Sequence, residues 1–331
     1  MQRNQLGRTG RQVGVIGLGA WQLGADWGEV SEDDALGTLN AAVDAGVDFI
    51  DTADVYGDGR SEQIVGRLLR ERPDAGLTVA TKMGRRVPQD PANYTLGNFR
   101  AWTDRSRSNL GVDTLDLVQL HCPPDPVFTS EAVYEALDTL VAEKRIAAYG
   151  FSVETCDQAL AAIRRPGVAT IQIILNAFRL KPLERVLPEA ARAGVGIIAR
   201  VPLASGLLSG RYTAQTSFGA NDHRNFNRAG EAFDVGETFS GVDYATGLEA
   251  VERLRRLVPE TVSQRATLAQ FALRWIADQP GLSVVIPGAR NADQARANAA
   301  AADLAALSQE THDAVRAVYD ELIRPSVHDR W

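Results

Sequence analysis

The stretch VDFIDTADVYGDGRSEQIVGRLL, residues 47–69, contains a complete strand–helix unit. Its opening run, residues 47–53, is short and mostly apolar, as in a strand whose two faces are both buried. After a Gly-rich turn, Ile64, Val65 and Leu68 recur at helical spacing behind Ser61, a residue type that favours a helix N-terminus. The stretch therefore predicts a buried β-strand followed by an amphipathic helix.

The same alternation of short apolar runs and amphipathic segments repeats through nearly the whole chain. Similar helical patterns follow Ser31 and Ser130. Eight strands, each followed by a helix at a spacing of roughly 35 residues, predict a (β/α)8 TIM barrel in which residues 1–331 form a single domain. The predicted strands are residues 13–19, 47–53, 77–83, 114–121, 147–153, 169–176, 194–202 and 283–289.

A doubly wound sheet is the main alternative fold for this pattern. Such a sheet would carry a GxGxxG fingerprint after its first strand. Gly17 and Gly19 begin that fingerprint, but Gln22 stands at its last glycine position. No linker rich in Pro, Gly or Ser divides the chain, so we favour the single barrel.

Three segments exceed what eight strand–helix units require. Residues 5–14 have the punctuation of a β-hairpin, with Thr9 and Gly10 as its turn, and such a hairpin can plug the bottom of a barrel. Residues 203–262, between the seventh strand and its helix, have a polar, aperiodic centre, which predicts a long loop that acts as a lid. A last helix follows the eighth unit and carries Val315, Val318, Tyr319 and Leu322.

Composition and charge argue against several classes of function. The chain of 331 residues has 35 Lys and Arg against 42 Asp and Glu, a formal charge of −7. Nucleic acids and anionic membranes bind clustered basic residues, so we expect neither as a partner. There is no secretory signal and no apolar run of the roughly 18 residues that span a membrane. Cys122 and Cys156 lack the pattern of a disulfide framework or a zinc site, so we expect a soluble, cytoplasmic protein with no metal.

Four polar side chains occupy places where catalytic groups of a barrel gather. Asp51, Lys82 and His121 end the second, third and fourth predicted strands, and Tyr56 follows Asp51 by five residues. Each alone is explained by an ordinary surface or capping role, but four on successive strands indicate a site. A Lys ammonium beside Tyr56 would lower the pKa of the phenol, which would then donate a proton to a carbonyl oxygen positioned by His121.

The chain lacks other recognisable sources of chemistry. It has no cluster of metal ligands, no GxSxG nucleophile elbow and no P-loop. The electron pair for carbonyl reduction is therefore expected from a bound hydride donor. A lyase or aldolase that uses Lys82 as a Schiff-base amine is an alternative, although it leaves the spacing of Asp51 and Tyr56 unexplained. His223, His312 and His328 stand apart from these motifs, and we expect them to face solvent.

The motifs around these residues resemble those of the aldo-keto reductase family, in particular its bacterial branch. DTADVYGDGRSE at 51–62, ATKMG at 80–84 and VQLHCPP at 118–124 carry the resemblance. It extends over almost the whole chain through GLGAWQLG at 17–24, GFS at 150–152, QIILN at 172–176, PLASGLLSGRY at 202–212 and VIPGARNADQARAN at 285–298.

The resemblance implies roles for individual residues. Tyr56 would be the general acid, Lys82 and Asp51 the pair that tunes it, and His121 the residue that orients the substrate carbonyl. A nicotinamide cofactor would be bound at its reactive end by Ala20, Trp21, Ser152, Gln172 and Arg200, along its pyrophosphate by Pro202, Leu203, Ser205, Leu207, Ser209, Gly210 and Arg211, and at its adenine end by Gly288, Arg290, Gln294 and Asn298.

Four positions depart from the family pattern. Val153 replaces the usual Asn after GFS, and Arg200 replaces an aromatic residue that commonly stacks on the nicotinamide. Gly288 and Gln294 replace the Lys and Arg that in some members bind the 2′-phosphate, which leaves Arg290 for that role. The resemblance implies NADPH as the cofactor, with NADH less favoured.

The resemblance implies that the protein is an NADPH-dependent oxidoreductase. It would reduce a small-molecule carbonyl, an aldehyde or ketone, to an alcohol, or oxidise a sugar or alcohol in the reverse direction. Some members of the family instead serve as cofactor-sensing subunits of larger assemblies with incidental turnover, and this regulatory role is the alternative function. The sequence carries no signal of oligomeric state.

Overall fold

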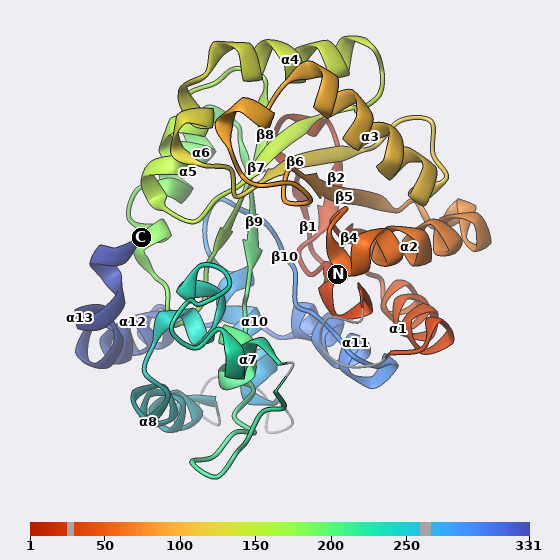
Figure 1. Cartoon of the computed structure of the whole chain (residues 1–331). Coiled ribbons are helices and arrows are strands. Elements are labelled where there is room, and N and C mark those ends of the chain that lie inside the picture. The colour runs from red at the N-terminus through yellow and green to blue at the C-terminus, as the bar shows by residue number, and fades with distance from the viewer. Residues whose placement is uncertain (25–29, 221, 259–265) are drawn as a thin grey trace.

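The computed structural model describes residues 1–24, 30–220, 222–258 and 266–331. Its central feature is a sheet of eight parallel strands in the order of the sequence (Figure 1). The strands are β3 (Leu18–Gly19), β4 (Phe49–Asp51), β5 (Thr78–Met83), β6 (Leu117–His121), β7 (Tyr149–Ser152), β8 (Val168–Ile174), β9 (Gly196–Arg200) and β10 (Leu282–Val285).

The two outer strands of the sheet meet, so that the sheet closes into a barrel. Ile16 forms a parallel bridge with Val285, and Gly19 forms one with Gly288. The amide of Gly17 donates to the carbonyl oxygen of Val285 at 2.8 Å. The predicted TIM barrel is therefore confirmed, and each predicted strand range contains an observed strand, except that β8 and β10 each begin one residue earlier.

A helix follows each strand and packs outside the barrel (Figure 1). The predicted start behind Ser31 is confirmed, because its side chain accepts a hydrogen bond from the amide of Asp34. Thr155 and Thr267 form capping boxes at two further helices. The barrel helices are α1 (Glu32–Asp44), α2 (Arg60–Glu71), α3 (Leu96–Leu110), α4 (Glu131–Ala142), α5 (Cys156–Ile163), α6 (Val186–Ala193), α10 (Leu268–Ala277) and α11 (Ala292–Ala299).

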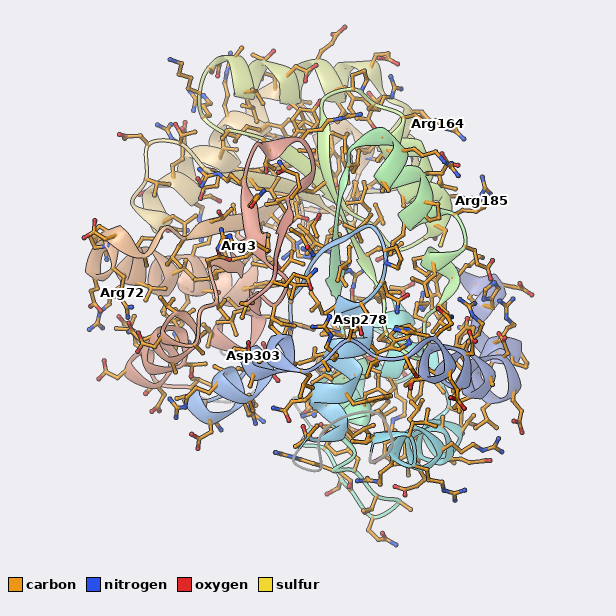
Figure 2. All side chains as sticks on the ribbon, turned by 180° about the vertical axis from the view of Figure 1, so that it is seen from behind. Arg3, Arg72, Arg164, Arg185, Asp278 and Asp303 are labelled. Carbon is orange, nitrogen blue, oxygen red and sulfur yellow. The ribbon has the colours of Figure 1, made fainter. Side chains whose placement is uncertain are left out.

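The N-terminal hairpin closes the bottom of the barrel. Strands β1 (Arg3–Gln5) and β2 (Gln12–Gly14) pair antiparallel, and a 3₁₀ turn at Gly7–Thr9 lies in the connection, which is longer than the predicted two-residue turn. The side chains of Leu6 and Val13 are fully buried in the interior cluster of the barrel. Figure 2 shows the hairpin with Arg3 on the face of the barrel that is turned away in Figure 1.

The segment at 203–262 is more ordered than its predicted loop. It contains α7 (His223–Phe226) and α8 (Tyr244–Arg255), so the prediction of a loop is wrong over α8. Val251 and Leu254 are buried on one face of α8, next to the C-terminal helices. Residues 221 and 259–262 of the predicted loop lie outside the described residues. The rest of the segment is anchored by contacts among the aromatic rings of Tyr212, Phe218, Phe239 and Tyr244.

The predicted last helix is present as α12 (Gln309–Val318), which continues through a π-helical turn into α13 (Arg324–Val327). Val315 and Tyr319 are fully buried. Across the described ranges, the helices include none with the length and apolar character needed to cross a membrane.

The hairpin plug yields a test of stability with a matched control. Gly7 and Gly10 both have positive φ, 50° and 74°. A Cβ on Gly7 would lie 2.0 Å from the carbonyl oxygen of Ala169, whereas a Cβ on Gly10 meets no atom within 4 Å. Gly10→Ala should cost about 1 kcal/mol from the left-handed conformation alone. Gly7→Ala should cost roughly 1–3 kcal/mol more, because the plug must also move away from the strands. Urea unfolding of both variants measures the difference, and equal losses would show that the hairpin does not pack tightly.

Candidate active site

A cavity of about 1370 Å³ opens at the end of the barrel opposite the hairpin. Its floor is lined by the last residues of four strands, Asp51, His121, Ser152 and Arg200, and by Gln172 of β8. Active sites of TIM barrels form at this end, where the strand–helix loops converge. The cavity continues from there to the N-terminus of α11, where Gly288, Arg290 and Gln294 line it.

The structure brings the four expected catalytic side chains together. Lys82 Nζ contacts the Asp51 carboxylate, donates to the carbonyl oxygen of Thr52 at 2.9 Å and lies 3.3 Å from Tyr56 Oη. The ring of Tyr56 meets the ring of His121 edge-on, with 5.9 Å between centroids. A continuous chain of polar contacts therefore runs from Asp51 through Lys82 to the Tyr56 hydroxyl, beside His121.

Both carboxylate oxygens of Asp51 accept hydrogen bonds from buried side chains. One carboxylate oxygen contacts Lys82, and the other accepts from Gln119 Nε2 at 3.1 Å and from Gln172 Nε2 at 2.7 Å. The second hydrogen of Gln172 Nε2 points to Gln119 Oε1 at 3.3 Å. Gln172 was expected to bind the nicotinamide carboxamide. With its amide hydrogens engaged in this way, its Oε1 is the side-chain atom left to accept a hydrogen bond.

Burial and charge set the protonation of the site. Burial raises the pKa of Tyr56 above its usual value, and the Lys82 ammonium, which acts against this, does not cancel it. The lowered pKa predicted from the sequence is therefore not found. Burial also opposes the charge of Lys82, but Asp51 and Tyr56 outweigh it and raise the Lys82 pKa. At neutral pH the phenol keeps its proton and the amine keeps its charge.

His121 is neutral and carries an unused polar atom. Burial, together with three nearby cationic side chains, holds the pKa of His121 well below its usual value. The imidazole is 6% exposed, and its Nδ1 has no hydrogen-bond partner in the part of the chain that the structure describes. A neutral imidazole can donate one hydrogen bond without bringing a second positive charge to the cavity.

The structure places nearly all expected cofactor residues on the cavity wall. Leu207 is the exception, because it is fully buried and packs beside Gly247 of α8. Gly288 leaves no room for a side chain, since a Cβ there would lie 2.1 Å from Nε2 of Gln22. The expected residues that line the cavity are Ala20, Trp21, Ser152, Gln172, Arg200, Pro202, Leu203, Ser205, Ser209, Gly210, Arg211, Gly288, Arg290, Gln294 and Asn298.

The chain leaves β9 through a strained turn along the cavity. Val201, Ala204 and Ser205 have φ of 52°, 47° and 55°, a region that non-glycine residues seldom occupy. Asn176 at the end of β8 supports the turn, because its Nδ2 donates to the carbonyl oxygen of Val201 and to Ser240 Oγ, each at 2.8 Å. Such strain persists where surrounding contacts hold it, and it is common at functional sites.

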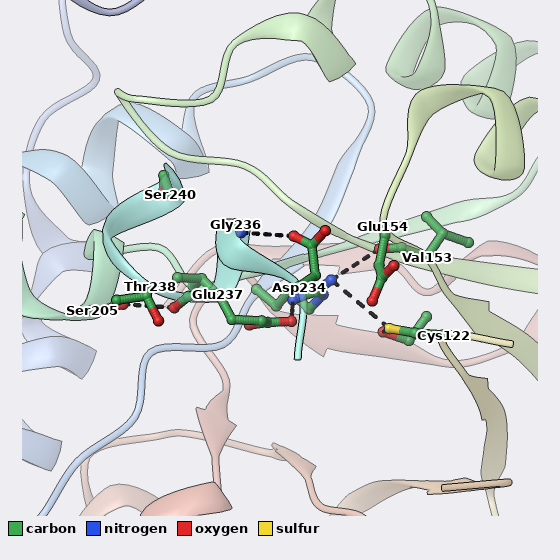
Figure 3. Close-up of polar contacts among 12 residues, drawn as sticks. Cys122, Val153, Glu154, Ser205, Asp234, Gly236, Glu237, Thr238 and Ser240 are labelled. Carbon is green, nitrogen blue, oxygen red and sulfur yellow. Dashed lines mark hydrogen bonds and ion pairs between the residues drawn. The ribbon is translucent and has the colours of Figure 1, made fainter. Parts of the chain in front are cut away.

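Glu237 contacts Arg200 inside the cavity and is not among the residues predicted from the sequence. Arg200 forms an ion pair with Glu237 and donates to the carbonyl oxygen of Val153 at 3.0 Å (Figure 3). Glu237 lies in the segment predicted as an aperiodic loop, where no motif marks it. The guanidinium that replaces the usual stacking aromatic residue is thus already held by a carboxylate.

An aromatic wall faces Tyr56, and it too was missed in part. The Trp21 ring is nearly parallel to the Tyr56 ring at 6.0 Å, and it meets His223 at 5.4 Å and Phe233 at 6.2 Å. The prediction that His223 faces solvent is wrong: the side chain is 3% exposed, and burial lowers its pKa to about 4. These rings give the mouth of the cavity an apolar lining.

The other two histidines also differ from the expected solvent-facing position. His328 is buried and lies 2.8 Å from Tyr319 Oη, and His312 is half-buried beside Asp278. Within the described ranges, no three His, Cys, Asp or Glu side chains come together as a metal site.

Comparison with known protein sequences gives one family. A family model described as "Aldo/keto reductase family" matches residues 15–320. The aldo-keto reductase YhdN of Bacillus subtilis is 31% identical and aligns over 90% of this chain and 87% of its own length. A probable voltage-gated potassium channel subunit beta of rice, Oryza sativa subsp. japonica, is 30% identical, with 96% of each chain covered.

Solved structures share the whole architecture. The glycerol dehydrogenase AKR11B4 of Gluconobacter oxydans superimposes with a TM-score of 0.76 at 29% identity, over 96% of this chain and 94% of its own. An aldo-keto reductase of Klebsiella pneumoniae, solved in complex with NADPH, superimposes with a TM-score of 0.72 at 24% identity over 96% of each chain. The chain belongs to the aldo/keto reductase family and is an NAD(P)-dependent oxidoreductase.

Proposed function

We propose that this protein is an NADPH-dependent reductase of aldehydes and ketones, which also runs in reverse on alcohols or sugars. The observation that carries the proposal is the polar chain from Asp51 through Lys82 to Tyr56, which ends beside His121 in the cavity. The dehydrogenase and reductase activities named for its relatives support the same class of reaction.

The cavity suits a dinucleotide. It is larger than the roughly 300–1,000 Å³ typical of small-ligand pockets. The side chains of His121 and Gln22 line its wall and bring polar groups to it, as in sites that orient a ligand. Three arginines toward its other end, Arg211, Arg255 and Arg290, suit phosphate groups.

The residues of this chain would share the chemistry as follows. When bound, a nicotinamide cofactor supplies the hydride. Tyr56 donates its proton to the carbonyl oxygen, and Lys82 stabilises the negative charge that develops on the phenol oxygen. Asp51 keeps Lys82 charged and in place, while His121 donates a hydrogen bond that orients the carbonyl. The rings of Trp21 and Phe233 exclude water from the reacting groups.

The 2′-phosphate of NADPH, which NADH lacks, would be bound at the N-terminus of α11. Arg290 precedes this helix, and its amide donates to Gln294 Oε1 at 2.9 Å, while Asn291 caps the helix. The Arg290 side chain is exposed at the cavity wall. A guanidinium at this position can form a charge-assisted hydrogen bond with a 2′-phosphate.

Two alternatives make different predictions. The raised pKa of Lys82 keeps its amine protonated and therefore argues against a Schiff-base lyase. The similarity to a probable potassium channel subunit is the observation that favours the other alternative, a regulatory role. A spectrophotometric screen of NADPH oxidation with aromatic aldehydes, dicarbonyls and aldoses separates these functions. NADPH binding without turnover of any substrate would favour the regulatory subunit.

Removal of the Tyr56 hydroxyl tests the assignment of the acid. Tyr56→Phe should lower kcat by roughly 10²–10⁴, the usual contribution of general acid catalysis, and should leave NADPH affinity nearly unchanged. Tyr134→Phe makes the same chemical change outside the cavity, where the hydroxyl donates to the carbonyl oxygen of Phe128, and should leave kcat unchanged. A Tyr56→Phe enzyme with near-normal kcat would remove Tyr56 from the mechanism.

The choice of cofactor can be tested at Arg290. Arg290→Ala should weaken NADPH binding roughly 10- to 100-fold, because a hydrogen bond to a charged group contributes about 1.5–3 kcal/mol, and should leave NADH binding nearly unchanged. The matched control is Arg296→Ala within α11, where the side chain pairs with Asp293 outside the cavity. Equal losses of NADPH and NADH affinity in Arg290→Ala would mean that Arg290 supports the loop and does not bind the phosphate.

A further inference from the structure

Arg200 and Glu237 form a buried ion pair at the catalytic end of the cavity. Their side chains are 9% and 12% exposed, and both line the cavity. A buried ion pair gains little stability over well-packed apolar residues, because both charges lose their water. The pair also takes no part in the chain of contacts from Asp51 to Tyr56, so its presence at this position calls for another role.

Arg200 lies next to the residues that would hold the reacting carbonyl. Its Nη2 is 3.9 Å from Sγ of Cys122, the residue that follows His121. A hydride can reach a carbonyl carbon held by Tyr56 and His121 only if the nicotinamide ring lies at this end of the cavity. The guanidinium therefore borders the place that the ring must occupy.

The proposed reaction changes the charge at that place. Carbonyl reduction breaks a C–H bond of a neutral dihydronicotinamide and moves the hydrogen with its electron pair to the carbonyl carbon, while the oxygen takes a proton from Tyr56. The nicotinamide ring is left with one positive charge. An uncompensated guanidinium beside it would repel the oxidised ring and have little effect on the neutral, reduced ring.

Glu237 is the carboxylate that contacts Arg200. Glu154 faces Arg85 at 3.9 Å. Asp234 accepts a hydrogen bond from the amide of Gly236 at 2.7 Å (Figure 3). Asp234 also accepts one from Trp331 Nε1 at 3.1 Å. These two acids lie near the pair, but their closest contacts are with other groups.

The segment after β9 holds Glu237 in position. Ser205 Oγ donates to the carbonyl oxygen of Glu237 at 2.7 Å and accepts from the amide of Phe239 at 3.0 Å. The backbone at Glu237 and Phe239 is thereby fastened to the strained turn that lines the cavity. These bonds join two segments more than 30 residues apart in the sequence, the turn after β9 and the stretch around Glu237. The Glu237 carboxylate contacts Arg200 because these segments lie together.

We propose that Glu237, by neutralising Arg200 beside the nicotinamide ring, sets the relative affinity of the site for the oxidised and reduced cofactor. This inference rests on the proposed function. Glu237 acts through Arg200 and is not itself a catalytic residue. In its presence the site accepts the cationic ring that hydride transfer produces, which supports turnover in both directions.

The ratio of dissociation constants, Kd of NADP⁺ over Kd of NADPH, tests the proposal without any turnover. Both constants are measured by isothermal titration calorimetry in the absence of substrate. Glu237→Gln should raise the ratio roughly ten-fold or more, because it leaves a positive charge within several ångströms of the ring. Arg200→Gln should lower the ratio, because it leaves Glu237 as an uncompensated anion. The double variant should return the ratio toward that of the unmodified protein.

A change of the same charge outside the cavity provides the control. Glu231→Gln removes an exposed carboxylate from the same segment, outside the cavity, so it should leave both dissociation constants and their ratio unchanged. Thermal melts establish that each variant is folded. If Glu237→Gln does not fold, Arg200→Gln and the double variant still give the sign of the effect.

Two results would overturn the inference. In one, the ratio stays constant in every charge variant although both nucleotides bind, which leaves the proposed function intact. In the other, both single variants shift the ratio in the same direction, as expected of a merely structural pair. Failure of the unmodified protein to bind either nucleotide would overturn the proposed function as well.

Discussion

The buried contact between Lys82 and Asp51 is the interaction on which the mouth of the barrel depends. The two residues are 1% and 2% exposed, and either charge alone would cost several kcal/mol to bury. Asp51 is therefore surrounded by donors, with Lys82 on one oxygen and Gln119 and Gln172 on the other. Because these residues lie on β4, β5, β6 and β8, the ion pair and its hydrogen bonds together fix the relative heights of four strands. The same geometry leaves Lys82 facing the Tyr56 hydroxyl, so that structural and chemical requirements coincide.

The two ends of the barrel have different roles: the end closed by the hairpin is apolar and stabilises the fold, and the end with the cavity carries the polar side chains of the site. At the bottom, Leu6 and Val13 of the hairpin complete an apolar layer with residues such as Phe49 and Leu117. At the top, the same strands end in ionisable side chains that line the cavity. A strand such as β4 serves both ends within three residues, since Phe49 lies in the interior cluster and Asp51 belongs to the site. Polar groups concentrate at the end where loops admit a ligand, and apolar groups fill the end that the hairpin closes.

The sequence was most informative where function depends on strand ends. Asp51, Lys82 and His121 each follow an apolar run, so the parallel sheet itself predicts that they meet, and the structure brings them together with Tyr56. Some predicted strands were too long, as at residues 13–19, where only Leu18–Gly19 pair as β3. The helix α8 was not predicted, although Val251 and Leu254 have helical spacing. The polar, aperiodic residues before it led to the prediction of a loop for the whole segment. Glu237 and His223 were not predictable, since their contacts depend on how that segment crosses the cavity.

The path of that segment is fixed by strain that two turns share. Val201, Ala204 and Ser205 have positive φ on one side, and Phe239 and Ser240 have it on the other. Each such residue is unfavourable alone, by about 1–2 kcal/mol. The two turns stabilise each other, because Asn176 bonds to Val201 and Ser240, and Ser205 bonds to Glu237 and Phe239. No periodic sequence is needed for such an arrangement, only a few polar side chains placed on a rigid barrel. A segment without a hydrophobic pattern can thus place a carboxylate against Arg200, just as a strand places Asp51 against Lys82.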